Sequence, residues 1–158
     1  MKLQLADKEK DAEFLFAVYA SSRQAEMELW GWPEMQRWPF LRMQYEAQRR
    51  AYGQRYPGFQ YRIIYSGDQK AGRVATVQTD TAIILVDIIL LPEFQNRGLG
   101  SKFLQELQAE AGRKQLPVSL TVLQGNRARR LYERFGFQVV GGADTPHVLM
   151  QWLPVPGP

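Results

Sequence analysis

Two glycines, Gly98 and Gly100, stand one residue apart between a strongly apolar run and an amphipathic helical pattern. The opening turn of a helix leaves several backbone N–H groups without intrahelical acceptors, and the helix dipole adds partial positive charge at the same end. Such an end attracts a phosphate group, and glycine lets the ligand approach the backbone. The two glycines therefore predict a site for a phosphate-bearing ligand, although close packing of the helix on a sheet would also use one of them.

The residues around these glycines do not fit either of the common nucleotide-binding loops. The pattern GxxxxGK[ST] is absent, and Phe103 occupies the third glycine position of GxGxxG. The hexapeptide QNRGLG, Gln95–Gly100, instead follows the pattern Q/R-x-x-G-x-G/A. ATP and NADH are therefore not the expected ligands.

A carboxyl group also stands where it is costly, because Asp87 interrupts the apolar run AIILVDIILL that begins at Ala82. An unpaired carboxylate inside a buried strand must find a partner or have its pKa raised. Asp87 is therefore a candidate for function, and a structural hydrogen bond to a neighbouring loop explains it equally well. Because side chains alternate along a strand, we expect Asp87 on the face opposite Ile88 and Leu90.

Hydrophobic periodicity indicates the elements that must position these residues. The run from Ala82 is nearly continuous in apolar residues, which predicts a central strand covered on both faces. The glycines should open a helix whose buried stripe is Leu99, Phe103, Leu104, Leu107 and Ala111, and a strand from Val118 should follow. Strand, helix and strand at this length predict a parallel crossover.

The rest of the chain gives further elements on the same grounds. Upstream we expect a strand over Lys2–Leu5, a helix that Asp7 caps and that ends near Ser22, a tryptophan-rich loop, and a second helix. The stripe of that second helix is Leu41, Tyr45, Gln48 and Tyr52. An antiparallel meander of three strands should follow, and a short helix from Asn126 and two strands should close one mixed α/β domain.

Composition excludes several kinds of chemistry. The chain has 158 residues, 45% of them hydrophobic, no cysteine and a single histidine, His147, which we expect at the surface. Thiol nucleophiles, Cys-ligated zinc and sites with two imidazoles are therefore excluded. No apolar run is long enough to cross a bilayer, so we expect a cytoplasmic protein without a membrane partner.

The charge pattern favours a small anionic partner over nucleic acid. The net charge is +4 and the pI is about 9.5, but the basic residues are spread among acidic ones. Only Arg127, Arg129 and Arg130 cluster. A nucleic-acid-binding domain would need a concentrated basic face with exposed aromatic side chains.

The QNRGLG hexapeptide and a second segment, NRARRLYERFGF from Asn126 to Phe137, resemble the acyl-CoA-binding motif and the NxxARxLYxxxGF segment of the GCN5-related N-acetyltransferase (GNAT) family. The upstream order of strand, two helices and three-strand meander is similar to that fold. The resemblance implies a single domain over residues 1–158 of mixed α/β (α+β) class. Its mainly antiparallel sheet of six to seven strands would carry about four helices, in the order strand, two helices, three strands, helix, strand, helix and two strands.

The resemblance also implies acetyl-CoA as co-substrate, with no metal. Backbone amides from Arg97 through Ser101 would surround the pyrophosphate, and the strand around Ile88–Leu90 would bond the pantetheine arm. Core packing explains Ile88 and Leu90 equally well, helix capping explains Asn126, and a solvated helix face explains Arg129. The cofactor-binding candidates are Ile88, Ile89, Leu90, Gln95, Asn96, Arg97, Gly98, Leu99, Gly100, Ser101, Asn126 and Arg129.

Tyr132 is the catalytic candidate. Transfer of an acetyl group from a thioester to an amine leaves a thiolate, and a phenol within hydrogen-bond reach can return a proton to that sulfur. The family places a tyrosine at this position for that purpose. Packing on the inner face of a short helix with Leu131 and Phe135 is the alternative explanation.

The acceptor site is expected where the chain matches the family least. Tryptophans in the loop between the first two helices can frame a cleft beside acidic residues, or cover the core, or form a homodimer contact. The candidates are Trp30, Trp32, Glu28 and Asp87. For the base, Glu26, Glu28, Glu34, Glu93, Asp87 and a water chain all stay open.

These residues favour a primary amine of a small molecule as the acceptor. A protein or peptide N-acetyltransferase is the alternative within the enzyme class. A nonenzymatic acyl-CoA-binding module is the alternative of another class, and the intact LYERFGF segment argues against it.

Overall fold

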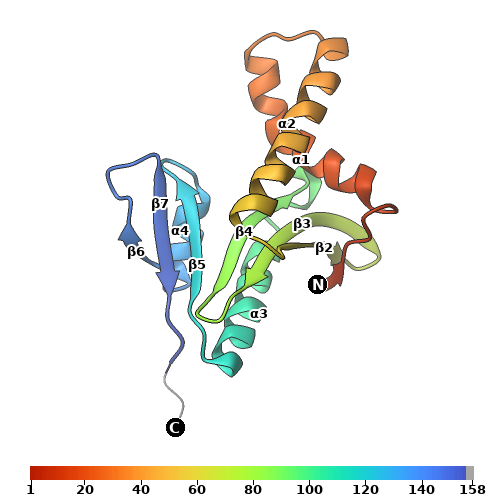
Figure 1. Ribbon diagram of the computed structural model, residues 1–158. Coiled ribbons are helices and arrows are strands. Elements are labelled where there is room, and N and C mark those ends of the chain that lie inside the picture. The colour runs from red at the N-terminus through yellow and green to blue at the C-terminus, as the bar shows by residue number, and fades with distance from the viewer. Residues whose placement is uncertain (156–158) are drawn as a thin grey trace. The chain divides into compact units, whose positions relative to one another are not determined.

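A computed structural model describes residues 1–155 of the chain, and it has the expected order of elements (Figure 1). The elements are β1 (Lys2–Leu5), α1 (Ala12–Leu29), α2 (Glu34–Arg55), β2 (Gln60–Ser66), β3 (Gln69–Gln78), β4 (Ile83–Leu90), the 3-10 helix η1 (Pro92–Phe94), α3 (Leu99–Lys114), β5 (Val118–Leu123), α4 (Ala128–Arg134), β6 (Gln138–Gly141) and β7 (His147–Trp152). The strands form a seven-stranded sheet in the order β1-β2-β3-β4-β5-β7-β6.

Sheet pairing confirms the mixed topology. β1 runs antiparallel to β2, β5 to β7 and β6 to β7, whereas β4 and β5 are parallel. The parallel pair is joined through α3, as the crossover prediction requires. The β4–β5 register covers Ile83–Leu85 opposite Val118–Leu120 and extends no further along β4.

The chain forms two compact units, each discontinuous in sequence. The first unit is Met1–Ala75 with Asp87–Arg97, and the second is Thr76–Val86 with the chain from Gly98 onward. The boundaries cut β3 and β4 within their lengths. That residues 1–158 act as one domain stays a prediction.

In the first unit, α1 and α2 pack as an antiparallel helix pair (Figure 1). Their inward stripes meet side chains of β2 in one apolar cluster, which matches the helix periodicity of the sequence. The buried members are Leu15, Phe16, Tyr19, Ala20, Met27, Leu41, Tyr45 and Ile63.

The helices are longer than the sequence indicated. The expected end near Ser22 is wrong, because α1 continues to Leu29. The expected tryptophan loop is shorter than predicted: Trp30 and Trp32 lie between the helices, but α2 begins at Glu34 and includes Trp38. Burial overrides the turn signals here: Met27 is fully buried in the cluster, and the Trp32 ring lies 4.7 Å from the Phe40 ring. Pro39 falls within α2 and forfeits only one intrahelical hydrogen bond.

Asp7 does not cap α1, contrary to expectation. Its Oδ1 accepts hydrogen bonds from the backbone N–H groups of Glu9 and Lys10, which closes a turn ahead of the helix. Asp11 stands at the helix start, and its side chain accepts from the Asp7 N–H at 2.7 Å. A short polar side chain binds the backbone N–H groups nearest to it in sequence. The Asp7 carboxylate therefore accepts from the turn residues and not from the first turn of the helix.

β4 is the fourth strand of seven, as its apolar sequence predicts, but it is not covered evenly. Ile83 and Leu85 are buried, whereas the residues from Val86 to Leu90 are only half-buried. The prediction of a strand covered on both faces is therefore wrong for its second half. That half carries Asp87 and the three backbone candidates.

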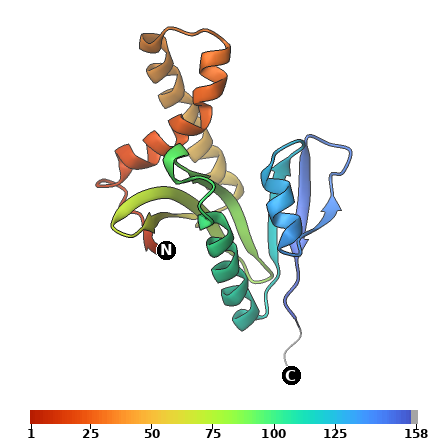
Figure 2. The ribbon, with the colours of Figure 1, turned by 180° about the vertical axis from the view of Figure 1, so that it is seen from behind.

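In the second unit, α4 lies on one face of β5 and β7, as two opposite views agree (Figure 2). Tyr132 of α4 is 7% exposed and packs with Phe137, the ring centroids being 5.7 Å apart. All five residues of the predicted α3 stripe are buried, and they are Leu99, Phe103, Leu104, Leu107 and Ala111.

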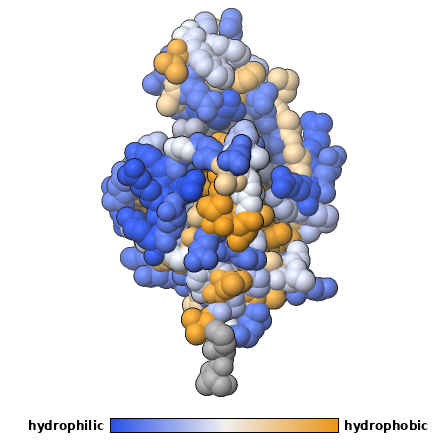
Figure 3. All heavy atoms as spheres, turned by 90° about the vertical axis from the view of Figure 1, so that its left-hand side faces the viewer, coloured by the Kyte–Doolittle hydropathy of each residue, from blue (hydrophilic) through white to orange (hydrophobic). Residues whose placement is uncertain are grey.

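Hydrophobic side chains gather on the side of the molecule where β6 and β7 lie (Figure 3). Val139 and Val140 of β6 and Leu149 of β7 are 37%, 55% and 38% exposed. Assembly as a homodimer stays a prediction.

Candidate functional site

The glycine loop opens α3 as its sequence indicates. Gly98 is the N-cap, with φ of 79° in the left-handed region, and the first intrahelical hydrogen bond runs from the Lys102 N–H to the Gly98 carbonyl. The N–H groups of Leu99, Gly100 and Ser101 precede that bond and have no carbonyl of their own helix to reach. The helix start therefore offers donors to an anion.

Side chains of the loop shape its backbone. The Gln95 amide donates to the Leu90 carbonyl at 3.0 Å, Asn96 adopts a left-handed φ of 61°, and the Arg97 guanidinium lies 5.4 Å from the Phe94 ring centroid. Gln95 thus ties the loop to the end of β4. Asn96, Arg97 and Gly98 are all exposed.

The two glycines have different surroundings. A Cβ at Gly98 would meet nothing within 4 Å, so only its backbone conformation requires glycine. A Cβ at Gly100 would lie 3.4 Å from Cδ2 of Leu131 on α4. That distance is an ordinary van der Waals contact, so packing alone does not require glycine at this position, and a role of Gly100 in binding the cofactor stays a prediction.

The second half of β4 is held by a glycine that the sequence analysis did not single out. A Cβ on Gly72 of β3 would clash with the Ile89 carbonyl oxygen and would lie 3.0 Å from Cα of Leu90. The Leu91 N–H donates to the Ala71 carbonyl at 2.8 Å just beyond. Only glycine permits this approach, and glycine inside a strand was the signal available.

The carboxylate of Asp87 forms an ion pair with the buried side chain of Arg73. Its Oδ2 accepts from Nη2 of Arg73 at 3.1 Å and from the Tyr52 hydroxyl at 3.4 Å. The Arg73 side chain is 1% exposed and that of Asp87 is 20% exposed. Arg73 Nη2 also donates to Oε1 of Gln48 at 3.1 Å. Asp87 therefore makes a structural hydrogen bond, as one of the two explanations predicted, but its partner Arg73 lies on β3 and not in a loop.

Aromatic rings surround the guanidinium of Arg73. Its Cζ lies 4.8, 5.5 and 6.0 Å from the ring centroids of Tyr61, Tyr45 and Tyr19. Nε and Nη1 of Arg73 are buried and have no hydrogen-bond partner within residues 1–155. The faces of aromatic rings attract a guanidinium and offset part of the free-energy cost of removing it from water. The rest of that cost is offset by the carboxylate of Asp87.

Burial dominates the titration of this group. It raises the pKa of Asp87 above the ordinary 3.8, although Arg73 and the Tyr52 hydroxyl act in the opposite direction. Burial and the nearby Asp87 carboxylate raise the pKa of Tyr52. Asp87 thus binds a proton more readily than an exposed aspartate does, as proton-transfer groups in active sites often do.

The NRARRLYERFGF segment forms the α4 region of the second unit. Oδ1 of Asn126 accepts from the N–H of Ala128, the first residue of α4, at 2.9 Å, so this side chain satisfies one backbone donor at the helix start, just ahead of the N-cap residue Arg127. Arg129 donates to Oε1 of Glu133 at 3.0 Å and to Oε1 of Gln124 at 3.4 Å. Roles for these residues and for Tyr132 in cofactor chemistry stay predictions.

The four acceptor candidates do not come together. Glu28 and Trp30 are exposed at the end of the helix pair where α2 begins, and Trp32 packs against Phe40. Gln48, which bonds Arg73, is fourteen residues further along α2 than Glu34, or about 20 Å at about 1.5 Å per residue. The helix pair extends where a loop was expected (Figure 1). This length along α2 carries the tryptophans away from Asp87.

Sequence reasoning missed Arg73, although the signal was available. Arg73 interrupts the apolar strand AGRVATV as Asp87 interrupts AIILVDIILL. Two opposite charges in neighbouring buried strands predict a pair. Gln48 and Tyr52 were on the expected inward stripe of the second helix, and the structure places both at this pair.

Two features of the described residues bear on the kind of site. Among residues 1–155, no group of three or more His, Cys, Asp or Glu side chains could hold a metal ion. None of the helices in that part of the chain is both long and apolar enough to span a membrane.

Comparison with known proteins connects these features. A family model described as an acetyltransferase (GNAT) domain matches residues 57–139, more than half of the chain, and this range includes both the glycine loop and Tyr132. No curated protein matches the sequence.

Several solved structures share the fold at low identity. The PaiA N-acetyltransferase of Thermoplasma acidophilum, in complex with coenzyme A, is 18% identical with a TM-score of 0.69, over 97% of this chain and 99% of that one. PH1933 of Pyrococcus horikoshii is 22% identical with a TM-score of 0.70, over 98% of both chains. An aminoglycoside 6′-N-acetyltransferase, complexed with coenzyme A, is 14% identical with a TM-score of 0.62, over 100% and 99%.

Proposed function

The chain belongs to the GNAT acetyltransferase family, and from that premise we propose that it transfers the acetyl group of acetyl-CoA to a primary amine of a small molecule. The observation that carries the proposal is the start of α3, where Gly98 in the left-handed conformation opens a helix whose first N–H groups are available to an anion. A pyrophosphate is the anion of coenzyme A that suits such a helix end.

Backbone groups bind most of the cofactor in this proposal. The N–H groups of Arg97 through Ser101 receive the pyrophosphate, and the half-buried backbone of Ile88–Leu90 bonds the pantetheine arm as a short added strand. Gly72 supports this role, because its missing side chain lets β3 hold the end of β4 closely.

The reaction is a direct attack. The amine nitrogen forms a bond to the thioester carbonyl carbon, the carbon–sulfur bond breaks, and the sulfur leaves as a thiolate. The nitrogen loses one proton to a base or to solvent, Tyr132 gives a proton to the departing sulfur, and Tyr132 regains one from solvent, which leaves the amide and the free thiol. The motif match of the LYERFGF segment supports this assignment, and the burial of Tyr132 supplies the low-dielectric surroundings in which such a step is effective.

Asp87 is the acceptor-side residue that the contacts favour. Its Oδ2 is held by Arg73 and Tyr52, while the side chain keeps 20% of its surface exposed and can meet an ammonium group or take its proton. Glu28, Trp30 and Trp32 lie too far along the helix pair to share one small acceptor with it. Fold neighbours named as aminoglycoside acetyltransferases support a small amine over a peptide.

Ligand-induced thermal stabilisation tests the cofactor. Acetyl-CoA at a hundredfold excess over its dissociation constant should stabilise the folded protein by about 2.7 kcal/mol, while ATP and NADH do little. Stabilisation by those nucleotides without an effect of acetyl-CoA would refute the assignment of QNRGLG.

Turnover tests the reaction. A panel of aminoglycosides, polyamines, amino acids and peptides is screened for release of the coenzyme A thiol, and the best acceptor is used with Tyr132→Phe. We expect turnover to fall by about 10²-fold or more with binding of acetyl-CoA retained. Acceptance of peptides alone would replace the small-molecule acceptor, and tight binding of acetyl-CoA without any turnover would favour the nonenzymatic module.

A further inference from the structure

A cavity in the first unit is lined by none of the residues to which the acetyl-transfer proposal gives a role. It has a volume of about 420 Å³, within the usual size of small-molecule sites. It is formed where the end of β1, the start of α1, the middle of α2 and the start of β2 meet. Its lining is Leu5, Ala6, Lys8, Ala12, Leu15, Arg42, Tyr45, Glu46, Arg49, Arg50, Phe59, Gln60 and Tyr61.

The inner wall of this β1–α2 cavity is formed by buried and closely packed apolar and aromatic side chains. Leu15 and Tyr45 are 6% and 4% exposed, and both belong to the core cluster of the unit. Phe59 and Tyr61 pack edge to face, with ring centroids 5.2 Å apart. Fixed aromatic walls favour a flat apolar body.

The remaining lining is cationic. Lys8, Arg42, Arg49 and Arg50 contribute four positive charges against the single carboxylate of Glu46. Arg49 is paired with Glu46 at 3.0 Å, and Arg42 is paired with Glu13 at 3.2 Å. Lys8 and Arg50 have no ion pair within the described part of the chain, so two cationic side chains at the cavity are not engaged by a carboxylate.

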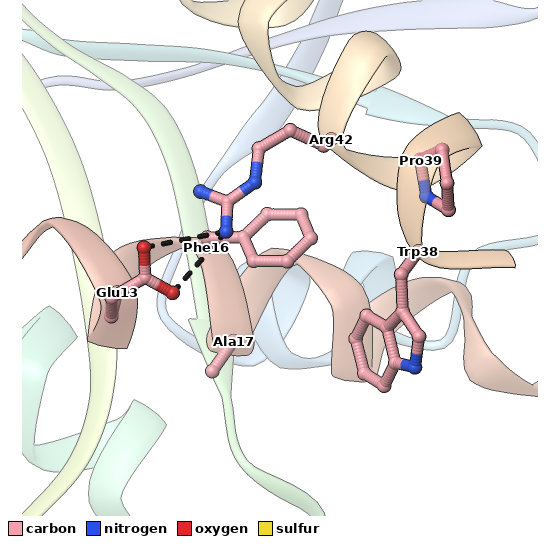
Figure 4. A pocket seen from close by; sticks show the side chains of 6 residues that line it. All are labelled: Glu13, Phe16, Ala17, Trp38, Pro39 and Arg42. Atoms are coloured by element: carbon pink, nitrogen blue, oxygen red, sulfur yellow. Dashed lines mark hydrogen bonds and ion pairs between the residues drawn. The ribbon is translucent and has the colours of Figure 1, made fainter. Parts of the chain in front are cut away.

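A second cavity on the same helix pair differs in charge, because its cationic side chain is paired with a carboxylate (Figure 4). It has a volume of about 500 Å³ and shares Arg42, whose guanidinium lies 3.9 Å from the Phe16 ring centroid and bonds Glu13. Its other lining residues are Ala17, Trp38 and Pro39. Its one cationic side chain, Arg42, already forms an ion pair with Glu13, so this cavity has no unpaired cation to bind an anion.

From this contrast we infer that the β1–α2 cavity binds a small organic anion with a flat apolar ring, whose acidic group meets Lys8 and Arg50 and whose ring lies against Tyr45 and Phe59. This binding does not depend on the acetyl-transfer proposal, since none of the cavity residues takes part in it. A carboxylate and a phosphate share the required chemistry.

Matched ligands test the inference by isothermal titration calorimetry on the full chain. Indole-3-acetate and indole-3-acetamide have the same ring and differ in charge, and phenyl phosphate represents the other acidic group. We expect the carboxylate to bind at least about tenfold more tightly than the amide, equivalent to about 1.4 kcal/mol, and to weaken as sodium chloride is added. Equal binding of carboxylate and amide, or no binding of either acid, would overturn the inference.

Variants locate the site. Lys8 and Arg50 are exposed, so Lys8→Ala and Arg50→Ala should leave the melting temperature unchanged and weaken indole-3-acetate binding by at least about fivefold each. Arg50→Lys should retain binding within about threefold. Arg55→Ala removes a positive charge from the same helix outside the cavity and serves as the control. An equal loss with Arg55→Ala, or none with Arg50→Ala, would exclude this cavity.

Discussion

The start of α3 and the Arg73–Asp87 pair use opposite means to present polar groups. The α3 start is exposed, relies on backbone N–H groups, and needs particular residues only where φ is positive, as at Gly98. The pair is buried, relies on side chains, and leaves Nε and Nη1 of Arg73 without partners among the described residues. Backbone sites tolerate varied side chains, whereas the buried pair makes each member depend on the other.

The largest expected effect comes from breaking the buried pair. Arg73→Met should leave the carboxylate of Asp87 without its counter-charge and lower the free energy of unfolding by about 3–5 kcal/mol, measured by urea denaturation. Arg49→Met removes a cation from the exposed pair with Glu46 and should cost no more than about 1 kcal/mol.

The double variant Arg73→Met, Asp87→Leu sharpens this test. Removing both charges takes away the burial penalty as well as the attraction, so most of the lost stability should return. A double variant as unstable as Arg73→Met alone would mean that Arg73 acts through packing among the three tyrosine rings and not through Asp87.

The next effect concerns the backbone region. Gly98→Ala forces a side chain into the left-handed conformation and should lower the free energy of unfolding by about 1–2 kcal/mol. Gly112→Ala lies within α3 with nothing near its Cβ and should raise it by about 0.5–1 kcal/mol. Thermal denaturation compares the two, and an equal response would show that the loop conformation does not depend on glycine.

A smaller effect separates capping from ligand binding at Asn126. Asn126→Ala should lower the free energy of unfolding by about 1 kcal/mol, because the Ala128 N–H loses its acceptor. Asn126→Ser restores a capping oxygen on a shorter side chain. If Ser restores stability but not the affinity for acetyl-CoA in calorimetry, the side chain contacts the cofactor; if it restores both, capping is its whole role.

The smallest effect is a pH dependence at the buried pair. Because burial raises the pKa of Asp87 above 3.8, the folded protein holds this proton more tightly than the unfolded chain does. That contribution is fully present below the unfolded pKa and is lost as the pH rises through the folded pKa. The difference in unfolding free energy between the wild type and Asp87→Asn should therefore decrease from pH 4 to pH 7. An increase would show that Arg73 outweighs burial.

The sequence predicts best where local chemistry decides the structure. The order of strands and helices, the buried stripe of α3 and the helix start at Gly98 follow from periodicity and glycine placement. The predicted helix boundaries are wrong between Ser22 and Phe40, because tertiary packing of Met27 and Trp32 lengthens both helices. Asp87 was recognised as costly, but its partner Arg73 is fourteen residues away and becomes evident only when β3 and β4 are placed together.

The separation of Arg73 and Asp87 along the chain has a consequence for biosynthesis. During synthesis, residues 1–75 leave the ribosome before Asp87 does. Until Asp87 emerges, Arg73 of β3 has no carboxylate partner, and its burial against the helix pair is therefore unfavourable. The first unit should therefore stay incompletely folded in nascent chains that stop short of residue 87 and become protease-resistant only in longer ones. Ribosome-arrested chains exposing residues 1–80 and 1–100 would display that step directly.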